Sequence, residues 1–230
     1  LPIFQKPMLW HIYNRMKHCK TLAQIVIATG AQTNNSQISD FARKFNMPCV
    51  VGSEKDLIDR LYKAATTFSA SAIVRVTADC PLIDPQLIDT MVNRYVEKNE
   101  QYDIVRNYGD QIRTFPHGLD TEIFSYSTLE KMWNTITSAE LREWFPLYVK
   151  QNPNLFRIME IKNPRDISSL RLTVDYLEDL EFVTRIYQKL YVEEQMFYLD
   201  DILRLLEQEP ELKKINSKYV GYHNIDAPEI

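Results

Sequence analysis

Two acidic residues each follow a short apolar run that is typical of a buried strand. Asp79 lies two residues beyond SAIVRVT (71–77), and Asp175 ends the run RLTVD (171–175). In open α/β sheets, ligands bind outside the carboxyl ends of the strands. Mg²⁺ prefers one or two protein carboxylates and completes its shell with water and phosphate oxygens. The two residues therefore indicate a metal site for a phosphate-bearing ligand, provided that the two strand ends are neighbours.

Each of these residues also has a plain structural interpretation. Asp175, followed three residues later by Glu178, forms a capping-box pattern for the next helix. Asp79 can instead be a turn residue. Cys80 has no activating base near it in the sequence, so we predict a small buried thiol rather than a nucleophile. His117 can be a ligand on a loop or an ordinary solvated histidine.

Two arginines are the cations most able to meet an anionic ligand. Arg75 lies inside the apolar strand pattern at 71–77. A buried arginine needs a partner, and one near a strand end can reach a phosphate or a carboxylate. Arg60 follows Asp59 on a predicted helix face, where an ordinary ion-paired residue is the alternative.

The elements that would position these residues alternate between strand-like and helix-like apolar periods. The predicted strands cover residues 21–30, 47–52, 71–77, 102–107, 118–124 and 171–175. The predicted helices cover residues 7–16, 38–45, 57–65, 87–96, 129–136, 141–149, 183–190 and 202–206. We expect Ser53 to cap the helix at 57–65, and Asp84 with Pro85 to begin the helix at 87–96. This alternation predicts an α/β fold with a mainly parallel sheet, covered by helices on both faces.

The beginning of the chain departs from that pattern. A doubly wound sheet usually opens with a strand and a glycine-rich turn, whereas here a helix pattern comes first. The five glycines, at 30, 52, 109, 118 and 221, exclude both GxGxxG and GxxxxGK[ST]. We therefore expect a strand and a phosphate-binding loop to be missing before residue 1. The lack of a central strand would leave a void in a close-packed core.

Composition excludes several classes of protein. Among 230 residues, 27 Lys plus Arg against 31 Asp plus Glu give a net charge of −4, which does not favour a nucleic-acid partner. No apolar run approaches the roughly 18 residues of a membrane helix, so we expect no membrane association. Three widely spaced cysteines and no signal segment favour the cytoplasm.

Several longer motifs resemble one family, the SpsF-type cytidylyltransferases, which are relatives of the synthetases that make CMP-activated sugar acids. The matching stretches are KPML (6–9), VGSEKDLIDRLYKAA (51–65), VRVTADCPLIDPQLID (74–89), FPHGLDTEIFS (115–125), LRLTVDYLEDLEFV (170–183) and LDDILRLLEQEPELKKIN (199–216). They cover nearly the whole chain in the family's order. Together they are specific, although any one alone would be weak.

The resemblance implies a Rossmann-like nucleotidyltransferase fold in which a sugar hydroxyl attacks the α-phosphate of CTP and pyrophosphate leaves. It implies that Asp79 and Asp175 hold Mg²⁺ and that Arg75 takes part in catalysis. The residues expected to bind the nucleotide are Lys6, Thr29, Asp59 and Arg60. The residues expected to face the sugar or sugar acid are Asn107, Asp120 and Glu122. The expected setting is the synthesis of surface polysaccharide.

The expected organisation is a nucleotidyltransferase-like domain over residues 1–190 and a helical extension over 191–230. The aromatic-rich stretch 108–150 can serve a homodimer interface or the substrate, or form a small second core. Two other functions stay open. One is a glycosyltransferase that uses a nucleotide-sugar donor. The other is a degenerate, non-catalytic homologue that acts as a binding or assembly protein.

Overall fold

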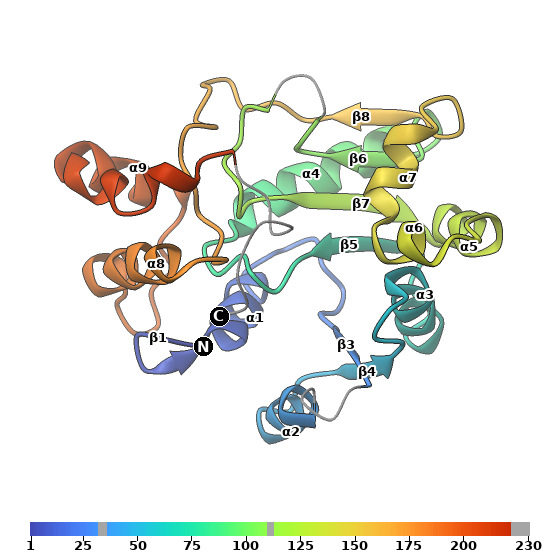
Figure 1. The fold of residues 1–230 in the computed structure, drawn as a ribbon, viewed down its shortest axis with the longest axis horizontal. Helices are drawn as coiled ribbons and strands as arrows, with labels where there is room; N and C mark the ends of the chain where they lie inside the picture. The colour runs from blue at the N-terminus through green and yellow to red at the C-terminus, as the bar shows by residue number, and fades with distance from the viewer. Residues whose placement is uncertain (32–35, 110–112, 222–230) are drawn as a thin grey trace.

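The computed structural model describes residues 1–31, 36–109 and 113–221 and contains two separate groups of strands beside a short hairpin (Figure 1). One sheet has the order β5 (Ala72–Val76), β7 (Thr121–Ser125), β6 (Ile104–Arg106) and β8 (Ile158–Glu160). A second sheet pairs β3 (Ile27–Gly30) with β4 (Cys49–Gly52). The hairpin pairs β1 (Pro2–Ile3) with β2 (Lys6–Pro7).

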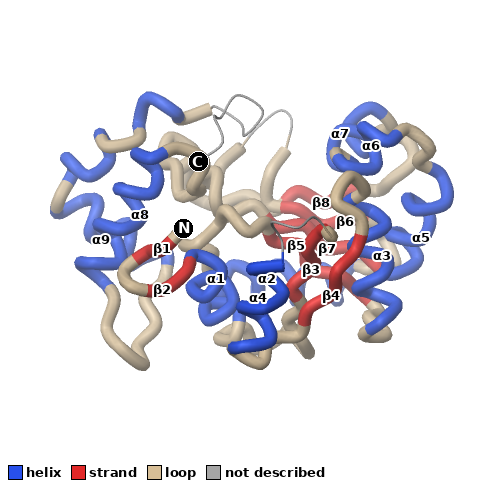
Figure 2. Tube along the Cα trace, turned by 60° about the horizontal axis from the view of Figure 1, so that its bottom comes forward, coloured by secondary structure: helices blue, strands red, loops and turns tan. Residues whose placement is uncertain are grey.

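The helices lie on both sides of the strands. They are α1 (Met8–Met16), α2 (Ser36–Lys44), α3 (Leu57–Thr67), α4 (Pro85–Lys98), α5 (Tyr126–Thr135), α6 (Ala139–Glu143), α7 (Phe145–Gln151), α8 (Leu177–Leu190) and α9 (Leu199–Gln208). Figure 2 shows α8 and α9 on one side and α3, α5, α6 and α7 on the other, with the strands between them. Within the described residues, no helix has the length and apolar character needed to cross a membrane.

The larger sheet is buried on both faces, as its apolar strands predict. Ile104 and Phe124 point into a core that includes residues of α3, α5 and α7. Their neighbours Val105 and Ile123 point to the opposite face, where they pack against Met91 and Tyr95 of α4, among others. Because successive side chains of a strand alternate between faces, short strands serve both cores. The predicted start of α4 is confirmed, since the Asp84 side chain accepts the backbone N–H groups of Gln86 and Leu87.

The expected mainly parallel sheet is wrong, because the larger sheet is mixed. β7 runs antiparallel to both β5 and β6, whereas β6 and β8 are parallel, as are β3 and β4. The chain enters β7 from β6 through a loop rather than a crossover helix. Such a connection returns the chain in the opposite direction, which only an antiparallel pair can accept.

Three local predictions are also wrong. Residues 171–175 form no strand; they make one isolated bridge at Arg171 and run past the strand ends. The cap of α3 is Asp56, whose carboxylate accepts the Asp59 N–H, and not Ser53. The single helix expected at 141–149 is two helices that change direction at Trp144. β8 was not predicted.

A cavity of about 990 Å³ separates the two sheets. It extends along β5, from Ser69 at one end to Ala78 at the other, and Ile27 and Ala28 of β3 line it as well. In the described part of the chain, β5 pairs only with β7, and β3 pairs only with β4. One open edge of each sheet therefore lines the same apolar cavity, which we call the β3–β5 cleft.

The predicted boundary at residue 190 does not separate two cores. Buried Phe182 and Ile186 of α8 belong to the same hydrophobic cluster as Ile202, Leu205 and Leu206 of α9. The last residues of the predicted extension, 222–230, lie outside the described part of the chain. The extension up to residue 221 is thus packed onto the rest of the molecule.

The aromatic stretch 108–150 contributes side chains to two hydrophobic clusters. Phe124 and Phe145 are buried in the cluster under α5 and α7, and Phe115 is buried beside α8. Trp144 and Leu147 are exposed. The homodimer stays a prediction.

Candidate active site

Asp79 and Asp175 are brought together by backbone contacts. The carbonyl oxygen of Asp79, in the loop after β5, accepts the Val174 N–H at 2.9 Å and the Thr173 hydroxyl at 3.1 Å. The two carboxylates are close enough to affect each other. Burial raises the pKa of Asp175 to about 6, and the negative charge of Asp79 adds to the rise. The structure thus brings the two residues into neighbouring loops, although residues 171–175 do not form the predicted strand, and the shared metal site stays a prediction.

Asp175 is oriented by a buried arginine. Nη2 of Arg171 donates to Asp175 at 2.5 Å, and Nε of Arg171 lies 3.0 Å from both oxygens of Asp179. Asp179 also accepts the backbone N–H groups of Asp175 and Tyr176, so it caps α8. The capping box that the sequence suggested for Asp175 and Glu178 is therefore wrong. The Asp175 carboxylate does not cap α8, so it is available to bind a ligand.

A single glycine lets the loop before β7 approach this segment. The carbonyl of His117 accepts the Leu172 N–H at 2.7 Å. At Gly118, φ is +99°, and an added Cβ would lie 2.3 Å from the carbonyl carbon of Leu172. A side chain at this position would overlap the backbone and would also strain the left-handed conformation.

The same loop carries a third carboxylate, that of Asp120. Asp120 accepts two bonds from Arg113, at 2.5 and 3.1 Å, and Nδ1 of His117 lies 3.7 Å from it. Burial raises the pKa of the Cys80 thiol, and the charges of Asp79 and then Asp120 raise it further. Cys80 is 2% exposed, so the prediction of a small buried thiol is confirmed. Asp120 therefore lies in the electrostatic range of the Asp79 loop.

Alternating charges form a row across the four strands of the larger sheet. In register, Arg75 of β5 faces Glu122 of β7, Glu122 faces Arg106 of β6, and Arg106 faces Glu160 of β8. Arg75 lies 3.4 Å from Glu122 and over the ring of Phe145. Burial raises the pKa of Glu122, and the charges of Arg75 and Arg106 oppose that rise. The predicted partner of the buried Arg75 is thus found. Within the described residues, Oε2 of Glu122 accepts no hydrogen bond.

Of the residues expected to bind the nucleotide, Arg60 lines the β3–β5 cleft, as Arg75 does. The Arg60 guanidinium donates to the Ser53 carbonyl at 2.5 Å and lies 3.9 Å from Glu143. Asp59 instead accepts the indole N–H of Trp133 at 3.0 Å, which ties α3 to α5. Arg60 therefore lies at the cleft, whereas Asp59 links two helices through a hydrogen bond.

The remaining predicted residues lie in other surroundings. Thr29 is buried on β3, where it pairs with Val51. Lys6 is exposed on the hairpin, with its Nζ 5.5 Å from the ring centroid of Trp10. The described contacts do not bring Lys6 to the aspartates.

Asn107, which was expected to face the sugar, is 1% exposed. Its amide donates to the Leu119 carbonyl at 2.7 Å and accepts the Thr121 N–H at 2.8 Å. These bonds bracket Asp120, so the geometry makes Asn107 a support for that carboxylate rather than a group open to a ligand.

Sequence reasoning missed three residues that organise the site, namely Arg171, Asp179 and Asn216. Arg171 carries the same signal as Arg75, because it is a lone arginine within an apolar run. Asn216 offers no such signal, since its contacts to Arg171 and Asp179 span 45 and 37 residues.

The donors at this site suit a hard divalent cation. Asp79 and Asp175 offer carboxylate oxygens at one place, with like charges close enough to raise a pKa. In the part of the chain that the structure describes, no group of three or more His, Cys, Asp or Glu residues is arranged to hold a metal. Two carboxylates with phosphate oxygens from a substrate are the arrangement that Mg²⁺ favours.

Comparisons with known proteins agree with this geometry. The cytidylyltransferase family matches residues 1–209. The spore coat polysaccharide biosynthesis protein SpsF of Bacillus subtilis is 28% identical over 169 residues, which cover 72% of this chain and 67% of SpsF. A solved structure of a cytidylyltransferase from Leptospira borgpetersenii matches with a TM-score of 0.86 at 31% identity, over 93% of this chain and 88% of that chain.

A more distant structure supports the fold alone. CMP:2-keto-3-deoxy-manno-octonic acid synthetase, complexed with CTP, matches with a TM-score of 0.61 at 16% identity, over 82% of this chain and 90% of that one. The predicted α/β nucleotidyltransferase fold is thereby confirmed. The comparisons do not support the expectation that a loop is missing before residue 1.

Proposed function

The chain belongs to the cytidylyltransferase family, and we propose that it transfers CMP from CTP to a hydroxyl of a sugar or sugar acid in a Mg²⁺-dependent reaction. The observation that carries the proposal is the contact between the Asp79 loop and the segment 173–175, which gathers two carboxylates at one edge of the sheet. SpsF, a relative named for spore coat polysaccharide biosynthesis, supports surface-glycan synthesis as the setting.

The reaction joins the acceptor oxygen to the α-phosphorus of CTP and breaks the bond to the bridging oxygen of the β-phosphate. Pyrophosphate carries away the electron pair, and the acceptor hydroxyl loses its proton. Such a transfer leaves a protein mainly positioning and charge neutralisation. When bound, Mg²⁺ would neutralise phosphate charge and lower the pKa of the attacking hydroxyl. Asp79 and Asp175 are the residues that would hold it.

The chain's own residues have separate tasks in this proposal. Arg171 keeps the Asp175 carboxylate in place through their buried ion pair. The Asp120 carboxylate, fixed by Arg113, is the proposed contact for hydroxyl groups of the acceptor. Arg75 is the proposed partner of a phosphate or of the acceptor's carboxylate, and Glu122 holds its guanidinium. Arg60 is proposed to contact the nucleotide, because it lines the same cleft.

Calorimetric titration of CTP with and without Mg²⁺ tests the binding step. We expect CTP affinity to rise when Mg²⁺ is present, and pyrophosphate release to require both CTP and an acceptor. Equal CTP affinity with and without the metal would count against the site. Turnover of a nucleotide sugar without pyrophosphate release would point to the glycosyltransferase alternative.

A further inference from the structure

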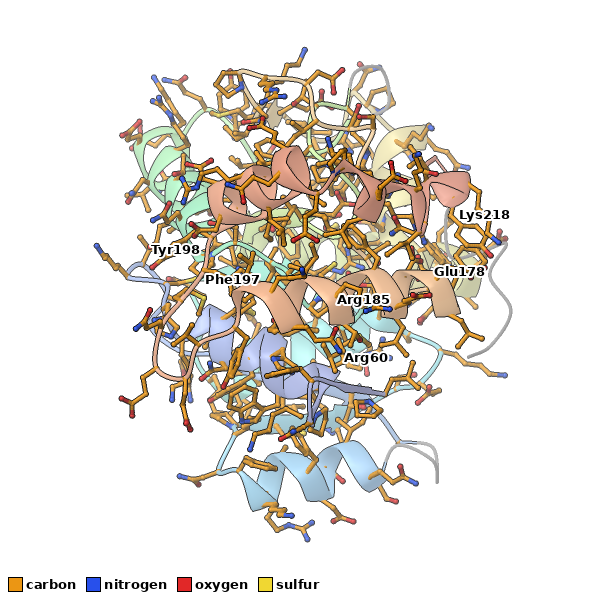
Figure 3. The ribbon with its side chains drawn as sticks, turned by 90° about the vertical axis from the view of Figure 1, so that its left-hand side faces the viewer. Arg60, Glu178, Arg185, Phe197, Tyr198 and Lys218 are labelled. Carbon is orange, nitrogen blue, oxygen red and sulfur yellow. The ribbon has the colours of Figure 1, made fainter. Side chains whose placement is uncertain are left out.

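Residues 216–219 dock on the beginning of α8, next to the segment that carries Asp175. Lys218 pairs with Glu178 at 2.7 Å, and Figure 3 shows the two side chains next to each other at that end of α8. The rings of Tyr219 and Tyr176 stack with a centroid distance of 3.8 Å and an interplanar angle of 4°. This docking segment lies beyond residue 209, where the family match ends.

Asn216 is the buried centre of this contact. It is 2% exposed, and its side-chain amide donates to Oδ1 of Asp179 at 2.9 Å and to the carbonyl of Arg171 at 3.0 Å. It therefore touches both residues that orient Asp175, one through its carboxylate and the other through its backbone. The contact satisfies groups that have little access to water, and leaving such groups without partners is costly.

The Arg171 guanidinium binds two carboxylates at once, which explains how the contact made by Asn216 can affect Asp175. Arg171 donates through Nε to Asp179 and through Nη2 to Asp175, and its side chain is 1% exposed. Asp179 is balanced by Arg171, by two backbone N–H groups and by Asn216. Without the Asn216 donor, the negative charge of Asp179 would draw the guanidinium more strongly, at the expense of its bond to Asp175.

Resting on the function proposed above, we propose that Asn216 is a positioning residue. Through Arg171 and Asp179 it holds the Asp175 carboxylate at the orientation that a divalent cation needs. Asn216 therefore supports the active site without touching the substrate. Partners behind metal ligands typically change metal affinity or activity by about 10–100-fold when they are removed.

The test compares Asn216→Ala with wild type and with Ser217→Ala, a control at the adjacent exposed residue. CTP binding is measured by calorimetry over a range of Mg²⁺ concentrations, and pyrophosphate release gives kcat and KM. We expect Asn216→Ala to raise the Mg²⁺ concentration for half-maximal CTP binding by about tenfold. CTP binding without metal should stay as in wild type, and Ser217→Ala should change neither.

A second variant covers the case in which Asn216→Ala does not fold. Tyr219→Ala removes the stacking on Tyr176 and the hydroxyl bond to Glu178 while leaving the bonds of Asn216 in place, and it should raise the Mg²⁺ requirement by less than Asn216→Ala does. Variants with melting temperatures near that of wild type but an unchanged Mg²⁺ requirement would overturn the inference. Wild-type protein that binds CTP equally with and without Mg²⁺ would instead overturn the proposed function.

Discussion

The two edges of β5 meet very different surroundings. One edge pairs with β7 over five residues, from Ala72 with Ser125 to Val76 with Thr121. The other edge lines the β3–β5 cleft. At the carboxyl end of the strand, the Asp79 loop is bound to 173–175 by two hydrogen bonds. The carboxylate half of the candidate site is therefore built rigidly, whereas the half beside Arg60 is open. The difference suggests that the metal side is preorganised and that the β3 side has room for the nucleotide.

The largest effect should come from the rigid half. Asp79→Asn removes a charged oxygen from the proposed metal site, and we expect kcat/KM to fall roughly a thousandfold. Pyrophosphate release measures it. Asp103→Asn is the control, because that carboxylate pairs with Arg157 near the opposite end of β6. Equal activity of Asp79→Asn and wild type would show that Asp79 takes no part in the reaction.

The next test asks how tightly the rigid half is packed. Gly118→Ala combines the left-handed φ with an overlap on Leu172, and we expect a loss of about 3 kcal/mol in the free energy of unfolding. Gly221→Ala is the matched control, since φ is +88° there and an added Cβ meets no atom of the described residues within 4 Å. Urea unfolding measures both variants. Equal losses would mean that the close approach at Gly118 is easily relieved.

A matched pair of isoleucines compares the two sides of the sheet directly. Ile73 of β5 and Ile104 of β6 both face Phe124 of β7 in register, but Ile104 is 3% exposed and Ile73 lines the cleft. We expect Ile104→Ala to cost about 3–4 kcal/mol and Ile73→Ala about 1–2 kcal/mol. Chemical denaturation measures the difference. Equal costs would mean that Ile73 is as well packed as Ile104 and that the cleft is closed in solution.

The smallest effect concerns pH. Because the pKa of Asp175 is raised to about 6, its carboxylate becomes protonated as the pH falls through 6 and can no longer bind a cation. Metal-dependent CTP affinity should fall by up to about tenfold for each pH unit below that value. Titrations at several pH values measure it, and a flat profile between pH 5 and 7 would contradict the raised pKa.

The free energy of unfolding should change with pH in the opposite direction to the CTP affinity. The folded protein binds the Asp175 proton more tightly than the unfolded chain, whose aspartate has the ordinary pKa of 3.8. The metal-free protein therefore gains stability from this group as the pH falls from about 6 toward 4. Asp175→Asn removes that contribution, so the difference between its stability profile and that of wild type isolates the group.

Much of the fold could be predicted because apolar periodicity is a local property. The helices around Phe41, Leu61 and Met91 each follow their own apolar stripe. The direction of β7 could not be predicted, because it depends on how a loop returns the chain. Residues 171–175 look like a strand, but their backbone partners lie in the loops at Asp79 and His117 rather than in a strand.

The candidate site divides in the same way. Asp79 and Asp175 are visible in the sequence because each acid lies at the end of an apolar run, and the structure binds the backbone of Asp79 to the segment that carries Asp175. Asn107 is also a polar residue at a strand end, but both ends of its side-chain amide are hydrogen-bonded to backbone groups. Which polar residues face a ligand depends on long-range partners, and single-sequence patterns carry little information about those.

The row of Arg75, Glu122, Arg106 and Glu160 also protects the sheet against mispairing. If one strand slipped by a single residue, its charge would turn to the face occupied by α4 and its neighbours would lose their counter-ions. Exchanging two neighbouring strands would set like charges opposite each other. The alternating charges therefore favour the observed strand order and register, although the four residues lie far apart in the chain.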